Sequence, residues 1–342
     1  MVDTPRPRER LPGLDILRGL AAVSVMAFHF TTRFGVIFGH PTRLWLLVPW
    51  GERGVDVFFV ISGFAIQLSI ESTNRARDFF FARAIRLYPT FWAAVALTFT
   101  VVAMFGLPER VTSPFDALVN LSMIPESLGA RTVDAVYWTL ERELRFYGLV
   151  LLLLALGLRQ YTVHVLLVAV AILAADSTSH AIPRFVADLL NAEYVHLFAC
   201  GAILARFRHV AWWKTFGLLA LCLGASSPIA AVSFHYTAVA VALVWLATRP
   251  FVGGPRRMRP LLFLGKISYP LYLVHQYIGY VLMRALYARG APPGVAIASA
   301  CAVALLNATA LHFLIERPCL DLIRRLRRMP TAPTPQTSAL PA

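Results

Sequence analysis

Residues 14–30 read LDILRGLAAVSVMAFHF, an apolar stretch that is long enough to form most of a membrane-spanning helix. It carries Arg18 near its start and His29 deep inside it. Eleven positions separate them, which on an α-helix is about three turns and about 16 Å of rise. We therefore expect both side chains on one face, with the guanidinium near a membrane surface and the imidazole near the middle of the bilayer.

The same apolar character extends over the whole chain. Of its 342 residues, 58% are hydrophobic and only 15% are charged, and the mean hydropathy is +0.64. This composition is too apolar for a soluble domain of this size. Continuous runs such as GLVLLLLALGL (148–158) favour helices, because a membrane β-barrel would show short alternating segments. We therefore predict an all-α, multi-pass helical bundle in the inner (plasma) membrane.

Hydropathy divides the chain into about ten segments, each near the length of about 20 residues that a helix needs to cross the bilayer. These predicted spans are 14–33, 54–72, 79–105, 136–157, 161–175, 190–206, 212–227, 231–248, 261–287 and 294–316. The first is interpreted as a retained span rather than a signal peptide, since no small-residue cleavage site follows it.

Basic residues are unevenly distributed over the loops of this arrangement. With both termini on one side, that side carries twenty of them: Arg6, Arg8, Arg10, Arg75, Arg77, Arg83, Arg86, Arg159, Arg206, Arg208, Lys214, Arg249, Arg256, Arg257, Arg259, Lys266, Arg324, Arg325, Arg327 and Arg328. The opposite side carries seven: Arg33, Arg43, Arg53, Arg110, Arg131, Arg184 and Arg289. The positive-inside rule therefore places both termini in the cytoplasm.

This asymmetry also accounts for the net charge of +14, so we expect no nucleic-acid partner. Anionic lipid headgroups and an anionic cytoplasmic ligand remain candidate partners. The predicted domains are a cytoplasmic tail (1–10), one membrane domain (11–320) and a basic, then disordered, cytoplasmic tail (321–342). The four cysteines show no paired metal-ligand spacing, so neither a metal site nor a disulfide scaffold is expected.

Ionisable residues inside spans are costly and usually face a cavity or a partner, so they mark candidate functional sites. Arg18 and His29 form the first of four. Two interpretations remain open for them. The arginine can extend to the interface while the histidine bonds a neighbouring helix. Alternatively, their shared face makes them a functional pair, in which a neutral imidazole acts as a general base.

The second and third sites lie near the ends of predicted spans. FFFARAIRLYPTFW (79–92) places Arg83 and Arg86 three residues apart on one helix face, either as a topology anchor or as a clamp for phosphate. YWTLERELRFY (137–147) packs four charged residues into one short segment. Buried ion pairs rarely repay their desolvation, which favours function. An interfacial charge cluster is the alternative.

The fourth site is LGKISYPLYLVHQ (264–276), where Ser268 and His275 are seven positions apart and so share a face. Tyr269 and Tyr272 lie nearby, and Pro270 is expected to break the helix. A broken helix within a bundle exposes backbone groups to a cavity or a ligand. A kinked structural helix with a satisfied histidine is the alternative.

Together these segments resemble the membrane acyltransferase-3 family, whose members O-acylate sugars and other hydroxyl acceptors. The matching pieces, in family order, are the Arg-x10-His pair Arg18 and His29, GVDVFFVISGFAI (54–66), the pair Arg83 and Arg86, WTLERELRFY (138–147), FACGAILAR (198–206), LGKISYPLYLVH (264–275) and IERP (315–318). They span about residues 11–320.

The resemblance implies roles for particular residues. His29 would be the catalytic histidine, with Arg18 as its partner toward the acyl donor. Arg83 and Arg86 would contact the acyl-CoA phosphates. In the family's Trp-Ser/Thr-Leu-x-x-Glu pattern the glutamate falls on Glu143, which we group with His29 as catalytic. The two preceding positions, usually uncharged in the family, are Glu141 and Arg142 here. We also expect the acceptor site or pathway to be lined by Trp138, Tyr147, Ser268, Tyr272 and His275.

The expected enzyme is an acyltransferase of groups other than aminoacyl groups, with no bound cofactor and with acyl-CoA, most simply acetyl-CoA, as co-substrate. It would transfer the acyl group to a hydroxyl of a carbohydrate or glycosylated acceptor of the cell envelope. Direct transfer is favoured because no Gly-x-Ser-x-Gly nucleophile motif occurs. The main alternative is a transporter or flippase for a glycan or an anionic small molecule. A non-catalytic membrane scaffold is a weaker one.

Overall fold

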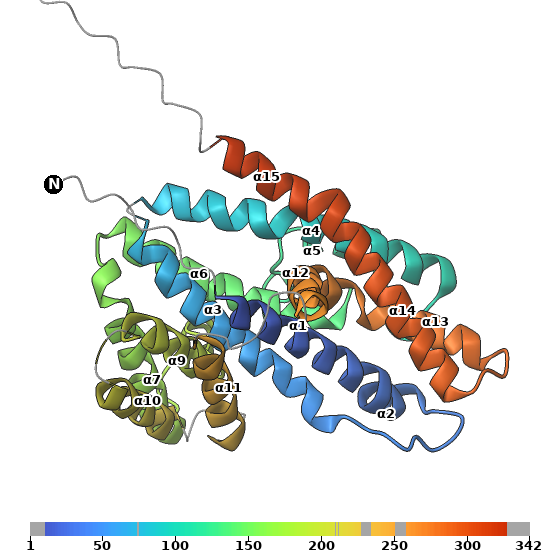
Figure 1. Ribbon diagram of the computed structural model, residues 1–342, viewed down its shortest axis with the longest axis horizontal. Coiled ribbons are helices and arrows are strands. Elements are labelled where there is room, and N and C mark those ends of the chain that lie inside the picture. The colour runs from blue at the N-terminus through green and yellow to red at the C-terminus, as the bar shows by residue number, and fades with distance from the viewer. Residues whose placement is uncertain are drawn as a thin grey trace, which may run out of the picture.

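The computed structural model describes residues 11–73, 75–208, 210, 212–226, 234–249 and 258–326, and these form helices and loops without a strand among them. The predicted all-α fold is therefore confirmed. Figure 1 shows the long helices α3, α4 and α14 assembled with α1 into one bundle, while α7, α9, α10 and α11 pack together beside α3. Of the predicted tails, 1–10 and 321–342, residues 1–10 and 327–342 lie outside the described residues, as do Arg256 and Arg257.

Five stretches of the described chain are long and apolar enough to cross a membrane: Pro12–Phe38, Pro49–Glu71, Ala76–Phe105, Arg159–Ser177 and Pro293–Leu322. Their helices are α1 (Pro12–Ala27), α2 (Phe34–Phe38), α3 (Gly54–Glu71), α4 (Ala76–Phe105), α7 (Thr162–Ser179) and α14 (Pro293–Leu311), with π-helical turns at Phe28–Arg33 and His312–Glu316. Large apolar side chains such as Met104, Leu306 and Leu314 are exposed on them. Lipid would cover such surfaces, which identifies a membrane protein.

The described chain contains further helices. They are α5 (Pro114–Asn120), α6 (Trp138–Ala155), α8 (Arg184–Leu189), α9 (Val195–Arg206), α10 (Trp212–Ser226), α11 (Phe234–Ala247), α12 (Arg259–Val274), α13 (Gln276–Tyr287) and α15 (Arg317–Leu326). α9 has 12 residues, about 18 Å of helix against a hydrocarbon core of about 30 Å. Its residues from Val195 to Ala205 are all buried, so this helix belongs to the protein core.

Two expectations about the C-terminal half need correction. The segment predicted as one span, 261–287, is divided at His275 into α12 and α13. Pro270, which was expected to break the helix, lies inside α12 instead. A proline removes one backbone hydrogen bond, and a helix packed against neighbours inside a membrane protein tolerates that loss. The last described helix, α15, ends at Leu326.

Glycines let several helices approach each other closely. A Cβ atom added to Gly201 of α9 would lie 2.0 Å from the carbonyl oxygen of Val60 in α3, and one added to Gly63 would lie 2.1 Å from that of Phe198. Gly265 of α12 meets the backbone of Asp15 in the same way, at 2.1 Å. Small residues at such contacts are the usual basis of helix packing in membranes. These contacts fix α1 and α3 against the helices that complete the site.

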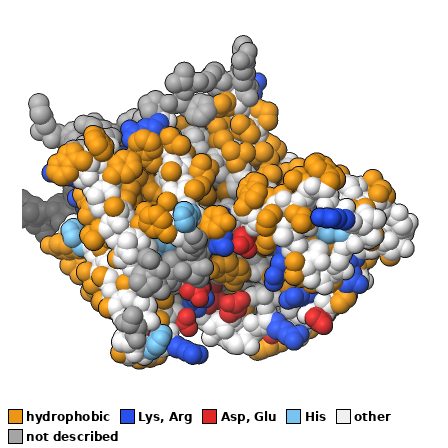
Figure 2. All heavy atoms as spheres, turned by 90° about the horizontal axis from the view of Figure 1, so that it is seen from below, with side chains coloured by type: hydrophobic (Ala, Val, Ile, Leu, Met, Phe, Trp, Pro, Cys, Tyr) orange, Lys and Arg blue, Asp and Glu red, His pale blue; other side chains and the backbone are white. Residues whose placement is uncertain are grey.

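Charged side chains gather at one hollow of the bundle, although most buried residues are hydrophobic. Figure 2 shows a hollow on one face of the molecule at which acidic and basic side chains gather, flanked by regions of mostly hydrophobic side chains. A hydrophobic exterior around a charged hollow is the arrangement expected when ionisable groups inside a membrane protein serve a function.

Candidate active site

In the part of the chain that the structure describes, two cavities are lined by the candidate site residues. The first, which we name the arginine cavity, has a volume of about 110 Å³. α1, α4 and α6 provide its charged groups: Arg18, Arg83, Arg86 and Glu143. Its wall also includes Ser62, Tyr147, Ser268, Tyr269 and Tyr272. The structure thus brings Arg18 together with the arginine pair of α4, although more than sixty positions separate them in sequence.

The polar contacts of this cavity leave cationic groups for a ligand. Arg83 donates through Nη2 to Ser69 Oγ at 3.3 Å, and its guanidinium carbon lies 5.9 Å from the centre of the Tyr147 ring. Arg83 Nε is buried without a hydrogen-bond partner. Glu143 accepts hydrogen bonds from Tyr147 and from Ser62, the latter at 2.7 Å. Three guanidiniums against one carboxylate suit an anion with several oxygen atoms, such as phosphate.

The second cavity, which we name the histidine cavity, has a volume of about 480 Å³. His29 lines it together with charged side chains, Arg33, Glu52, Arg53, Asp56 and Arg110, and with a wall that includes Phe28, Trp138, Tyr194, Tyr272, Gln276 and Tyr277. Charged and amide groups beside aromatic rings suit a polar organic molecule with both hydroxyl groups and an apolar face.

The two cavities meet at Val55 and Tyr272, which line both. Tyr272 is firmly held at this junction. Its hydroxyl lies 2.9 Å from Thr139 Oγ1 and 3.3 Å from the carbonyl oxygen of Val136, and its ring packs edge-on against Phe58 at 5.7 Å between ring centres. Val55 and Tyr272 therefore form part of the wall between the arginine cavity and the histidine cavity.

His29 is paired with a second histidine. His29 Nδ1 lies 2.9 Å from His275 Nε2, and the ring centres are 5.0 Å apart. His275 is fully buried and is not among the residues that line either cavity. It was expected to line the acceptor pathway, but it meets the histidine cavity through its contact with His29.

The other expected site residues divide between the cavities. Trp138 lines the histidine cavity, whereas Tyr147 and Ser268 line the arginine cavity, and Tyr272 lines both. Glu143, which was grouped with His29, faces the arginine cavity and so lies on the other side of the junction from it.

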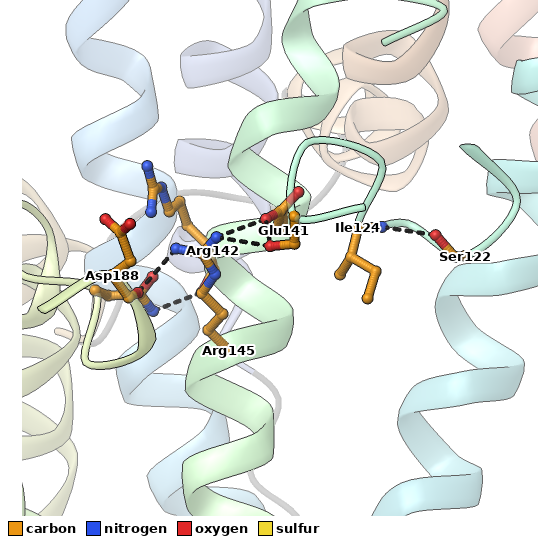
Figure 3. Close-up of polar contacts among 8 residues, drawn as sticks. Ser122, Ile124, Glu141, Arg142, Arg145 and Asp188 are labelled. Carbon is orange, nitrogen blue, oxygen red and sulfur yellow. Dashed lines mark hydrogen bonds and ion pairs between the residues drawn. The ribbon is translucent and has the colours of Figure 1, made fainter. Parts of the chain in front are cut away.

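Glu141, Arg142 and Arg145, the other charged residues of this segment of α6, make contacts outside the two cavities. Figure 3 shows the Arg145 side chain extended between Glu141 and the backbone at Asp188. Arg145 Nη2 lies 2.6 Å from Glu141 Oε1, and Nη1 donates to the Asp188 carbonyl at 2.8 Å. Asn191 donates to the Arg142 carbonyl at 2.7 Å. These contacts tie α6 to the end of α8 and to the residues that follow it, which is a structural role and distinguishes Glu141 from Glu143.

Two buried aspartates were not singled out from the sequence. Asp56 lies inside the segment 54–66 and is 3% exposed. Its Oδ2 has no hydrogen-bond partner, and the ion pair to Arg53 is long, at 4.0 Å. Asp134 is fully buried and accepts from the amides of Val136 at 3.2 Å and Tyr277 at 3.1 Å. Asp56 could have been identified from the sequence, because it is a carboxylate inside a predicted span. Asp134 lies in a loop, where a carboxylate is not unusual.

The fold and the two cavities define a helical membrane protein in which a cavity lined by three arginines adjoins one lined by His29, which is paired with the buried His275. A family model described as an acyltransferase domain, acyltransferase-3, matches residues 11–312. The chain belongs to this family, and the protein is an acyltransferase. The expected resemblance is confirmed.

Known proteins with similar sequences carry related names. The chain is 28% identical to acyltransferase MdmB of Streptomyces mycarofaciens in an alignment of 378 residues. This alignment covers 97% of each of the two chains. Nodulation protein 10 of Rhizobium leguminosarum bv. viciae is 29% identical over 180 residues, 46% of this chain and 48% of that protein. YrhL of Bacillus subtilis (strain 168), provisionally named a peptidoglycan O-acetyltransferase, is 26% identical over 166 residues, 43% of this chain and 24% of that protein. No solved structure matches the chain.

Proposed function

We propose that this protein is a membrane O-acyltransferase that transfers an acyl group, most simply acetyl, from acyl-CoA to a hydroxyl of a carbohydrate or glycosylated acceptor. The observation that carries the proposal is the junction of the two cavities at Val55 and Tyr272. A donor held by its phosphates in one cavity can there meet an acceptor held in the other. The name of the YrhL relative supports an acetyl group and a glycan acceptor.

The arginine cavity is the donor side of this proposal. Arg18, Arg83 and Arg86 line it, and the buried Arg83 Nε lacks a partner. CoA phosphates would supply acceptor oxygens to these groups, while the extended pantetheine arm would carry the thioester past Tyr272. Glu143 contributes from this side, because its hydrogen bond from Tyr147 fixes the ring that lies beside Arg83.

The histidine cavity is the acceptor side. His29 takes the proton of the acceptor hydroxyl as that oxygen attacks the thioester carbonyl carbon. The carbon–sulfur bond then breaks, and the proton passes from His29 to the departing thiolate, which leaves as CoA. The acceptor leaves as an ester, so the step needs neither an enzyme-bound acyl group nor a further reactant.

This reaction has a direction across the membrane. We propose ten spans in the inner membrane with both termini in the cytoplasm, which places the ends of the chain on the side where acyl-CoA is available. The acceptor would then be modified on the opposite side of the bilayer, and the donor would never leave the cytoplasm. The excess of basic residues on one set of loops supports this orientation.

The test compares wild-type protein with His29→Ala and with a matched control, His164→Ala, whose side chain is exposed on α7. Purified protein in nanodiscs receives acetyl-CoA and an envelope glycan extract, and the released CoA thiol is measured. Loss of a general base lowers the rate by about 10²- to 10⁴-fold. We expect that loss for His29→Ala alone, with unchanged yield and unfolding temperature.

Near-normal turnover in His29→Ala would contradict the general-base role. A wild-type protein that releases no thiol above the background would favour a transporter and would contradict the enzyme as proposed. Mass spectrometry of glycans from cells with and without the protein gives an independent measure, because acyl esters should appear only in cells that carry it.

A further inference from the structure

The break between α12 and α13 places His275 at the end of a helix. The last four carbonyl groups of any helix lack amide partners within it, and at the end of α12 two of them belong to Leu271 and Tyr272. His275 Nδ1 lies 3.1 Å from the Leu271 carbonyl oxygen and 2.9 Å from that of Tyr272. The imidazole thus satisfies backbone groups that the helix itself leaves open.

These contacts determine where the ring protons lie. A carbonyl oxygen only accepts hydrogen bonds, so His275 Nδ1 must carry a proton and donate it. A neutral imidazole has one ring proton, which leaves His275 Nε2 with a lone pair. That nitrogen lies 2.9 Å from His29 Nδ1, and two lone pairs cannot bond each other. His29 Nδ1 must therefore be the donor, so the single ring proton of a neutral His29 is on Nδ1.

We propose that His275 is a positioning residue that fixes the tautomer and the orientation of His29, so that His29 Nε2 is the unprotonated nitrogen available to the acceptor hydroxyl. His29 Nδ1 donates to His275 Nε2, and His275 Nδ1 donates to the fixed backbone carbonyls of α12, so the helix break itself sets the protonation of the base. This inference rests on the proposed role of His29 as general base. An imidazole held by its other nitrogen is the usual way in which proteins select a tautomer.

Two substitutions separate this role from simple packing. His275→Leu fills the space but neither donates nor accepts. His275→Gln keeps one donor group and one acceptor oxygen, which can receive the proton of His29 Nδ1. With acetyl-CoA and the envelope glycan extract, we expect His275→Leu to lower kcat by about 10²-fold or more, within the range for loss of a base. The KM for acetyl-CoA should stay unchanged. The kcat of His275→Gln should exceed that of His275→Leu by about tenfold or more, and a factor of ten corresponds to about 1.4 kcal/mol.

A spectroscopic measurement tests the tautomer without any turnover. The ¹⁵N chemical shifts of histidine rings distinguish protonated from unprotonated nitrogen, and the His29 signals are identified by their loss in His29→Ala. We expect Nδ1 protonated and Nε2 unprotonated in the wild-type protein and in His275→Gln, and a mixture of both tautomers in His275→Leu.

A wild-type His29 protonated at Nε2 would overturn the inference, as would full activity of His275→Leu. Equal losses of kcat in the Leu and Gln variants would show that His275 only supports packing. These failures can be told apart from failure of the proposed function. If His29→Ala is inactive while His275→Leu is fully active, the result supports His29 as the general base and contradicts only the positioning role of His275. If His29→Ala is active, the proposed function itself is wrong.

Discussion

Individual charged residues on α4 differ in environment although they belong to one basic segment. Arg77 is exposed, whereas Arg83 and Arg86 line the arginine cavity. The spacing of three positions puts the latter two on one face of the helix, and the packing of α4 against α6 and α12 turns that face inward. A topology anchor needs only charge near the membrane surface, so the enclosed position of Arg83 and Arg86 favours a ligand.

This difference gives a prediction for donor binding. Arg83→Gln and Arg86→Gln should each weaken the binding of acetyl-CoA, because a hydrogen bond to a charged group contributes about 1.5 to 3 kcal/mol, or roughly 10- to 150-fold in Kd. Calorimetric titration of the purified protein measures it. Arg77→Gln is the control and should bind acetyl-CoA as the wild type does. Equal affinity in all three variants would leave the pair as a topology anchor.

At the scale of helices, the contact of α3 with α9 depends on having no side chain at two positions. The Val60 carbonyl approaches Gly201, and the Phe198 carbonyl approaches Gly63, so the two backbones are almost in contact. α3 carries both Ser62, which bonds Glu143, and Val55 at the junction of the cavities. The position of α3 against α9 therefore affects both sides of the site.

Gly201→Ala should be strongly destabilising, because its Cβ would stand 2.0 Å from a backbone oxygen that cannot turn away. Overpacking of a core costs about 1 to 3 kcal/mol or more. Gly148→Ala in α6 is the matched control, since a Cβ there meets nothing within 4 Å and alanine favours helix by about 1 kcal/mol. Thermal unfolding in detergent should show a lower Tm for Gly201→Ala and an unchanged or higher one for Gly148→Ala. A wild-type Tm in both would mean that α3 and α9 are less tightly packed.

For the whole molecule, the path of the chain connects the site to two sides of the membrane. Figure 1 shows α4 running from the end of the bundle where α3 finishes to the opposite end. The loop after α4, residues 106–113, and the connection between α6 and α7, residues 156–161, belong to opposite ends in the same view. The proposed orientation puts the former outside the cell and the latter in the cytoplasm.

Two single cysteines test this orientation, Val111→Cys and Gln160→Cys, both at exposed positions. Cys200, Cys222, Cys301 and Cys319 are first replaced by alanine, and thiol release from acetyl-CoA checks that this background is intact. A thiol reagent that cannot cross membranes should label Val111→Cys in intact cells and Gln160→Cys only after permeabilisation. The reverse pattern would contradict the cytoplasmic placement of the termini, and labelling of both in intact cells would contradict the span count.

The sequence by itself determined the helical membrane fold, because hydropathy and continuous apolar runs are local properties that do not depend on how the helices pack. It also led to the family, since motifs in a fixed order are read along the chain. It separated Glu143 from Glu141 through the family pattern, and the structure gives the two different surroundings, with Glu141 paired to Arg145 and Glu143 facing the arginine cavity.

Only the tertiary structure decided which polar groups meet. His29 and His275 are 246 positions apart, and no local pattern records that their rings touch. The break at His275 and the buried Asp134, which accepts from the Tyr277 amide across 143 positions, likewise depend on how α12 and α13 pack. The geometry of a helix determines which residues share a face. Which other helix contacts that face depends on the packing of all the helices together, through close glycine contacts and the hydrogen bonding of buried polar groups.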